Sequence, residues 1–160
     1  MITYHNGDLL GSKCDIICHQ VNLQGIMGGG IALQIARKYP GCESRYKRFV
    51  KEQELINLGA VFMYRHYNGD YIANCFTQDE NFNTDYSALS FALKRIKDFC
   101  EQHSVKTVGF PHGYGCGIAN GNWEVVEGVI KSAFENTEID CQIWRFNNEQ
   151  RLPTTFLPKA

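Results

Sequence analysis

Two glycine-rich segments, each placed just beyond a β-rich run, constrain this chain more than any other feature of its sequence. The first spans residues 25–30 and follows the apolar run that ends at Val21. The second spans residues 112–117 and follows a shorter run that ends at Phe110. In open α/β sheets, ligands bind beyond the carboxyl ends of the strands. Both segments would lie at that edge, so we expect an α/β fold with a ligand site between them.

The rest of the chain alternates between strand and helix patterns. Residues 84–103 are the clearest helix, because apolar side chains recur there at the i, i+3, i+4, i+7 spacing. Asn68 and Gly69 are typical of a hairpin turn, Pro40 should end one helix, and Asn122 should cap another. The expected strands are residues 1–5, 15–21, 60–67, 70–76, 107–110 and 141–146, and the expected helices are residues 31–39, 41–53, 84–103 and 123–135.

This pattern predicts a three-layer α/β/α sandwich whose central sheet is mixed, because the hairpin adds an antiparallel pair to otherwise parallel strands. The length suits one domain over residues 1–160. We expect a tail from about residue 147, where prolines interrupt any regular pattern. The apolar content of 44% favours a folded core over disorder.

Charge and hydropathy exclude several classes of partner. Sixteen Lys and Arg residues against seventeen Asp and Glu residues give a net charge of −1, which argues against a strong nucleic-acid footprint. The chain has no apolar run long enough to span a bilayer and no leader pattern, so no membrane association is expected. We expect a monomer that needs no cofactor.

The seven cysteines indicate free thiols in a reducing compartment. Their number is odd, and several lie inside apolar runs, where a thiol behaves as a small buried hydrophobe. Cys14, Cys18 and His19 do not have the spacing of a zinc site, so no metal is expected. A cytoplasmic location is the simplest prediction.

Glycine loops at this edge can hold an anion. Successive N–H groups form an anion-binding concavity, and a helix that starts at the loop adds its positive end. Two such loops suit a diphosphate held from both sides; alternatively, both are only tight strand-to-helix turns. Neither loop has the spacing of a P-loop or of a dinucleotide-binding fingerprint. A kinase, a P-loop NTPase and an ordinary NAD dehydrogenase are therefore not expected.

Three segments together resemble a macrodomain: Gly7-Asp8-Leu9, residues 21–32 and residues 111–118. The resemblance extends from Ile2 to Phe146. It is nearest to the branch that contains the terminal ADP-ribose protein glycohydrolase and DNA-ADP-ribose hydrolases, and to the yeast-type phosphatase acting on ADP-ribose phosphorylated at the distal ribose. It implies that the ligand is ADP-ribose or an ADP-ribosylated macromolecule.

The resemblance also implies roles for individual residues. Asp8, with Leu9 beside it, would accept a hydrogen bond from the adenine amino group, although a Gly-Asp pair can simply cap a turn. Asn22 would orient the distal ribose or hold its own loop, and Phe146 would stack on adenine or belong to the core. The backbone donors implied for the diphosphate and distal ribose are Gly28, Gly29, Gly30, Ile31, Gly115, Cys116, Gly117 and Ile118.

The chain departs from the protein glycohydrolase pattern at two positions. Gln78 and Ala119 stand where that branch has a catalytic Lys and Asp, so a lysine adduct is not expected. Other macrodomain hydrolases use a water held by the ligand's own phosphate, with the protein supplying position. A thiol nucleophile at Cys116 is not expected either, because a cysteine between two glycines donates its backbone more readily.

His19, Asp79 and His112 are the candidates for proton transfer. His19 alternatively belongs to the core, Asp79 is alternatively a surface acid, and His112 is alternatively a solvent-facing loop residue. We expect a hydrolase that removes ADP-ribose from a protein or nucleic acid, or phosphate from the distal ribose. The alternative is a module that binds ADP-ribose or a related NAD-derived signal without cleaving it.

Overall fold

The computed structural model describes residues 1–146, and the expected tail from residue 147 lies outside the described residues. Within them, a six-stranded sheet runs in the order β1-β6-β5-β2-β4-β3. All neighbouring strands are parallel except β3 and β4, which form the hairpin expected at Asn68 and Gly69. The strands are β1 (Ile2–Asn6), β2 (Ile16–Val21), β3 (Val61–Arg65), β4 (Tyr71–Phe76), β5 (Thr107–Pro111) and β6 (Asp140–Arg145).

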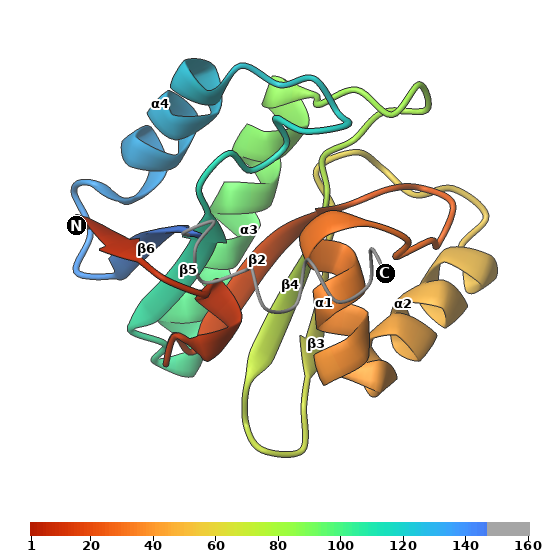
Figure 1. Ribbon diagram of the computed structural model, residues 1–160, viewed down its shortest axis with the longest axis horizontal. Coiled ribbons are helices and arrows are strands. Elements are labelled where there is room, and N and C mark those ends of the chain that lie inside the picture. Colours follow the sequence, from red (N-terminus) through yellow and green to blue (C-terminus); the bar gives the residue numbers. More distant parts are fainter. Residues whose placement is uncertain (147–160) are drawn as a thin grey trace, which may run out of the picture.

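Helices cover both faces of the sheet, as expected for a three-layer sandwich (Figure 1). One face carries α1 (Gly30–Lys38) and α2 (Pro40–Glu52), and the other carries α3 (Tyr86–His103) and α4 (Trp123–Phe134). A short 3-10 helix, Leu9–Gly11, follows β1 and was not expected. Within residues 1–146, no helix is both long and apolar enough to cross a bilayer.

Alternation along the strands divides the core in two. On β2, Ile16 and Cys18 pack under α3 and α4, whereas Ile17 and Val21 pack under α1 and α2. Because successive strand residues point to opposite faces, His19 lies on the same face as Ile17 and Val21. This alternation determines which polar side chains of β2 lie in the core and which lie near the carboxyl end of the strand.

Local sequence signals explain where α2, α3 and α4 begin. The side chain of Asn122 accepts a hydrogen bond from the backbone N–H of Glu124, which confirms the expected cap of α4. Asp85 caps α3 in the same way through the N–H of Ala88. Pro40 does more than end α1: it begins α2, because proline suits the first turn, where its missing N–H costs no hydrogen bond.

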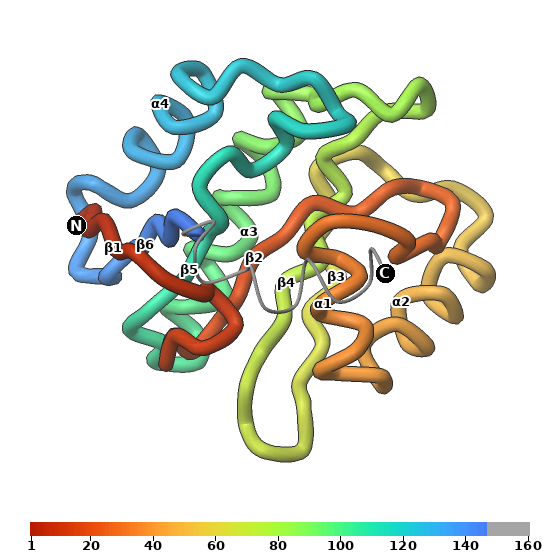
Figure 2. The backbone as a smooth tube through the Cα atoms, in the orientation of Figure 1, coloured from red at the N-terminus to blue at the C-terminus, as the bar shows by residue number. Residues whose placement is uncertain are grey.

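The sheet places five chain segments along one edge. The strands β1, β6, β5, β2 and β4 are parallel, so their carboxyl ends meet there in that order. Figure 2 shows the loops after β2 (orange), β5 (teal) and β4 (yellow-green) leaving the sheet toward the same side. The two glycine-rich segments therefore face each other although about 85 residues of chain separate them.

Candidate functional site

A cavity of about 670 Å³ opens at this edge of the sheet. Its volume falls within the range of small-molecule sites. The lining comes from the loops after three adjacent strands: residues 20–22, 26 and 28–32 around β2, residues 78 and 82 after β4, and residues 111–115 and 117–119 after β5. The structure thus brings both glycine loops to one cavity.

Two of the lining glycines are unexplained by the protein's own packing. A Cβ atom added at Gly29 or Gly117 would meet nothing within 4 Å. Gly29 has an extended φ of −155°, and Gly117 lacks the positive φ that favours glycine. Neither crowding nor backbone conformation therefore requires glycine there. Both positions leave open space beside exposed backbone, which is what a closely approaching ligand needs.

The first turn of α1 offers unused hydrogen-bond donors to the cavity. The helix begins at Gly30, and its N-cap, Gly29, provides no side-chain hydrogen bond. The first N–H groups of a helix have no intrahelical acceptor, and Gly30, Ile31 and Ala32 line the cavity. Because α1 also has no acidic residue in this turn, the turn presents the positive end of the helix to an anion.

The second glycine loop is held by polar contacts that sequence reasoning missed. Thr84 donates its hydroxyl to the carbonyl oxygen of Gly115 at 2.6 Å, and Gln20 Nε2 donates to Thr84 Oγ1 at 3.1 Å. Gly115 has a φ of +70°, and a Cβ there would lie 2.7 Å from the Thr84 hydroxyl. Glycine is required at this position by the fold itself. These contacts join segments distant in sequence, so no local pattern indicates them.

Asn22 organises the first loop from within. Its side-chain oxygen accepts from the N–H groups of Gln24 and Ile26 at 3.0 and 3.2 Å, and its Nδ2 donates to the Ile26 carbonyl at 2.9 Å. The expected structural alternative for Asn22 is therefore realised. Asn22 also lines the cavity, and its Nδ2 carries a second N–H that can still reach a ligand.

His19 does not reach the cavity, which corrects the expectation that it transfers protons there. Its side chain is completely buried under α1 and α2, with Nε2 2.7 Å from Asn74 Oδ1. Its Nδ1 has no hydrogen-bond partner among the described residues. Burial lowers the pKa of His19 to about 4, so the ring stays neutral at physiological pH. The structure supports the alternative of a core histidine.

Asp79 and Cys116 are also used by the protein itself, and neither lines the cavity. The Asp79 carboxylate accepts from the N–H groups of Asn81 and Asn83, both at 2.9 Å, and so fixes the turn after β4. The Cys116 thiol donates to the Tyr114 carbonyl at 3.3 Å, and burial raises its pKa. The structure therefore brings neither an acid at residue 79 nor a thiolate at residue 116 to a ligand here.

Backbone hydrogen bonds already use one of the N–H donors expected in the second loop and leave others available. The Cys116 N–H donates to the Gly113 carbonyl at 2.9 Å and is already used. Within the described residues, the N–H groups of Gly117 and Ile118 have no such partner. We therefore expect Gly117 and Ile118, and not Cys116, to be the anion donors of this loop.

His112 is the one histidine, among the described residues, that lines the cavity. Its ring lies against Trp123, with centroids 4.5 Å apart, and its backbone N–H donates to the Trp144 carbonyl. Lys, Arg, Asp and Glu are absent from the lining as far as residues 1–146 show. What this lining offers an anion is therefore backbone dipoles rather than charged side chains.

The expected adenine-contacting residues lie outside the cavity. Asp8 is exposed and caps the 3-10 helix, where its carboxylate accepts from the Leu10 N–H at 3.0 Å. Leu9 is buried in the core, and Phe146 is half-buried just beyond β6. Asp8 and Phe146 follow β1 and β6, so they sit on one side of the edge while the cavity lies at β5, β2 and β4.

Gln78 and Ala119 both line the cavity, so the structure brings together the positions where the resemblance implies a Lys and an Asp. Gln78 is buried, and its Nε2 donates to the Phe82 carbonyl at 3.1 Å. Phe82 also lines the cavity and was not predicted from the sequence, because nothing in its sequence neighbourhood marks it.

Within the described residues, no group of three His, Cys, Asp or Glu side chains could hold a metal.

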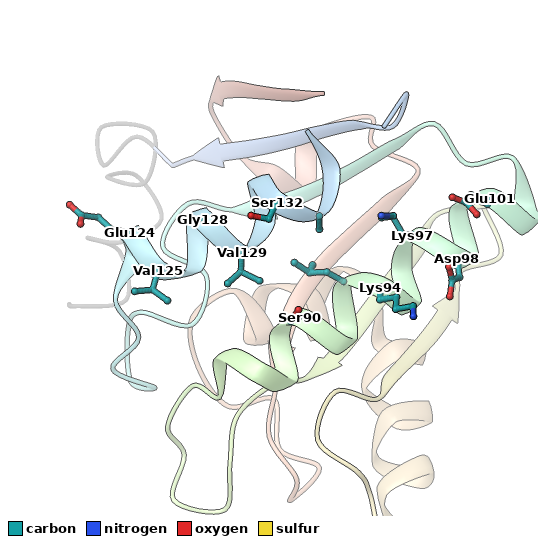
Figure 3. A pocket seen from close by; sticks show the side chains of 12 residues that line it. Ser90, Lys94, Lys97, Asp98, Glu101, Glu124, Val125, Gly128, Val129 and Ser132 are labelled. Carbon is teal, nitrogen blue, oxygen red and sulfur yellow. The ribbon is translucent and has the colours of Figure 1, made fainter. Parts of the chain in front are cut away.

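A second cavity of about 880 Å³ lies between α3 and α4 (Figure 3). Its lining comes from these two helices alone, with Gly128 and Ser132 on one side and Ser90 and Lys94 on the other. Among residues 1–146, no glycine loop borders it. It is a groove between helices and lacks the convergent backbone donors of the first cavity.

Comparisons of sequence and of structure with known proteins lead to the same family. The Macro domain family matches residues 18–130. Human ADP-ribose glycohydrolase OARD1 is 28% identical over 145 residues, which are 89% of this chain and 90% of the human protein. The DNA ADP-ribosyl glycohydrolase of Mycobacterium tuberculosis is 30% identical over 151 residues, and the match covers 90% of this chain but 42% of that protein. The solved macrodomain of M. tuberculosis DarG superposes with a TM-score of 0.82 at 30% identity, covering 90% of this chain and 97% of that one.

Proposed function

This chain belongs to the Macro domain family, and from that premise we propose that it binds ADP-ribose and hydrolyses an ADP-ribose derivative. The observation that carries the proposal is the pair Gly29 and Gly117. Both face open space in one cavity, and neither is required by the protein's own packing or backbone conformation. A ligand whose phosphates approach the backbone closely accounts for glycine at both places.

The ligand lies along the carboxyl edge of the sheet. Its diphosphate sits between the first turn of α1 and the N–H groups of Gly117 and Ile118. The adenine contacts that the resemblance implies for Asp8 and Phe146 give its direction. Adenine lies toward Asp8 and Phe146, at β1 and β6, and the distal ribose lies toward Asn22, at β2.

The chemistry is water attack positioned by the loops. A water molecule held by a phosphate oxygen of the ligand attacks the anomeric carbon of the distal ribose. The bond from that carbon to the leaving group breaks, its electron pair goes to the leaving group, and the water's proton passes to the phosphate oxygen. Gln78 and Ala119 cannot act as lysine nucleophile and carboxylate, so positioning supplies the rate enhancement.

Three substrates and one titration test this function. The protein is incubated with an ADP-ribosylated peptide, an ADP-ribosylated oligonucleotide and ADP-ribose phosphorylated on its distal ribose, and release of ADP-ribose or phosphate is followed. Calorimetry measures binding of ADP-ribose itself. Binding with turnover of one substrate is expected. Binding without turnover of any would favour a non-catalytic module, and absence of binding would contradict both.

We also infer that the protein acts as a single-domain monomer in a reducing compartment such as the cytoplasm. All seven cysteines are free, and six of them are buried. Buried thiols suit a compartment that keeps them reduced. Gel filtration, with and without ADP-ribose, checks the oligomeric state.

A further inference from the structure

Phe82 has an unusual backbone conformation at the edge of the candidate site. Its φ is +64°, in the left-handed region that a bulky side chain rarely adopts. Such strain persists only where the surrounding structure imposes it, and it is concentrated at functional sites. Phe82 lines the cavity, so the strained position and the site coincide.

Hydrogen bonds hold the Phe82 backbone in place. Its N–H donates to the Asp79 carbonyl at 2.9 Å, and its own carbonyl accepts from Gln78 Nε2 at 3.1 Å. The Asp79 carboxylate fixes the same turn through the N–H groups of Asn81 and Asn83. These hydrogen bonds hold the turn in one backbone conformation, which lowers the entropic cost of presenting the ring to a ligand.

The ring is not buried by the protein. Phe82 is 44% exposed although it borders the cavity, and Ile26 and Ile118, from the other two loops, are 58% and 88% exposed. Three large apolar side chains thus surround the mouth of one cavity, each from a different loop. Exposed apolar groups that cluster in this way mark a binding surface.

The position of Phe82 along the edge identifies the part of the ligand that it faces. Phe82 follows β4, beside β2 and its loop residue Asn22, and three strands separate β4 from β1, which Asp8 follows. If adenine lies at the β1 end, as the proposed function on which this inference rests requires, the distal ribose points toward β4. The group attached to the anomeric carbon then reaches the apolar mouth.

We propose that Phe82 is a specificity-determining residue that stacks on a planar nucleobase attached to the distal ribose. An aromatic ring binds any base through its π-face without reading sequence. The cavity lining, among the described residues, offers no charged side chain that would pair with charged groups of a peptide around the modified residue. With a net charge of −1, we expect the base rather than the phosphate backbone to supply the selectivity.

The test compares Phe82→Ala and Phe82→Tyr with wild type on two substrates. One is a single-stranded oligonucleotide with ADP-ribose on a base, and the other is a peptide with ADP-ribose on a glutamate. Phe82→Ala should lower kcat/KM for the oligonucleotide by about 10- to 100-fold, as expected for loss of one stacked base. Phe82→Tyr should restore it. Turnover of the peptide and the Kd for free ADP-ribose should change less than twofold.

Phe91→Ala is the matched control, because Phe91 is also exposed, at 58%, but lies on α3. It should behave as wild type. Phe82→Gly checks folding: glycine tolerates the positive φ, so this variant should remain folded and show the same loss as Phe82→Ala.

Three results would overturn the proposal: unchanged oligonucleotide turnover in Phe82→Ala, equal losses on both substrates, or a wild-type preference for the peptide. If the wild type binds ADP-ribose but cleaves neither substrate, competition binding replaces turnover. The modified oligonucleotide should then bind more tightly than ADP-ribose in wild type but not in Phe82→Ala, and equal affinity in wild type would contradict the role of Phe82. Failure to bind ADP-ribose at all would instead remove the proposed function, and with it this inference.

Discussion

The hydroxyl of Tyr46, on α2, lies 2.6 Å from the backbone carbonyl oxygen of Asn22 and 2.8 Å from its side-chain oxygen. Tyr46 is completely buried, and burial raises the pKa of its hydroxyl to about 12. The hydroxyl therefore remains a donor throughout the physiological range. It joins the second helix to the loop that starts the candidate site, across 24 residues of chain.

Tyr46→Phe should weaken ligand binding by loosening this loop. The substitution removes a buried donor and leaves the oxygens of Asn22 without it, at a cost of about 1–2 kcal/mol in stability. We expect the Kd for ADP-ribose, measured by calorimetry, to rise several-fold. Tyr67→Phe is the control, since Tyr67 is 94% exposed, and it should change neither value. An unchanged Kd in Tyr46→Phe would show that the hydroxyl does not position the loop.

Gly117→Val should weaken ligand binding without changing the stability of the fold. A Cβ at Gly117 meets nothing within 4 Å, so the free energy of unfolding should change by less than about 0.5 kcal/mol. The added side chain would occupy the place of the diphosphate, so affinity for ADP-ribose should fall at least tenfold. Gly128→Val, an equally open glycine on α4, is the control for added bulk and should leave binding intact. Full affinity in Gly117→Val would contradict the placement of the diphosphate.

Gly115→Ala should behave in the opposite way. Its Cβ would lie 2.7 Å from the Thr84 hydroxyl, at a φ of +70°. We expect a loss of about 1–3 kcal/mol in unfolding free energy, measured by urea titration. Stability equal to that of wild type would mean that the contact between Thr84 and the loop is easily displaced.

His19 should make stability depend on pH. Its pKa is about 4 in the folded protein and near its ordinary 6.5 in the unfolded chain, so the unfolded state binds the proton more readily. Its contribution is complete above pH 6.5 and is lost as pH falls toward 4, approaching about 1.4 kcal/mol per pH unit. Urea titrations between pH 7 and pH 5 should show this slope in wild type and in His112→Gln. A wild-type slope near zero would exclude a buried neutral histidine.

His112→Ala should reduce kcat by less than tenfold. The ligand's phosphate takes the water's proton in the proposed mechanism, so the imidazole is not required for it. A general acid or base usually contributes 10²- to 10⁴-fold. The loss in kcat is measured by single-turnover kinetics on the substrate that the wild type cleaves. A loss in that larger range, with unchanged ADP-ribose affinity, would assign proton transfer to His112.

Features of the fold that neighbouring residues decide could be predicted from the sequence. The hairpin at Asn68, the cap at Asn122 and the apolar periodicity of α3 depend on neighbouring residues, and each is confirmed. The meeting of the two glycine loops could also be expected, because parallel strands end at one edge.

The site could not be predicted where it depends on how the layers assemble or on loop backbone geometry that no turn signal marks. Which face of the sheet His19 points to depends on how the layers are assembled, and it lies in the core. The positive φ of Phe82 depends on Gln78 and Asp79, which no turn signal indicates. The use of Cys116 and Asp79 within their own loops likewise follows from backbone geometry and not from residue type.

A crystal structure with bound ADP-ribose tests the central claim most directly. The account predicts diphosphate oxygens within hydrogen-bond distance of N–H groups from both loops, those of Gly30 or Ile31 and those of Gly117 or Ile118, with the distal ribose toward Phe82. A ligand held by one loop alone, or seated between α3 and α4, would contradict it.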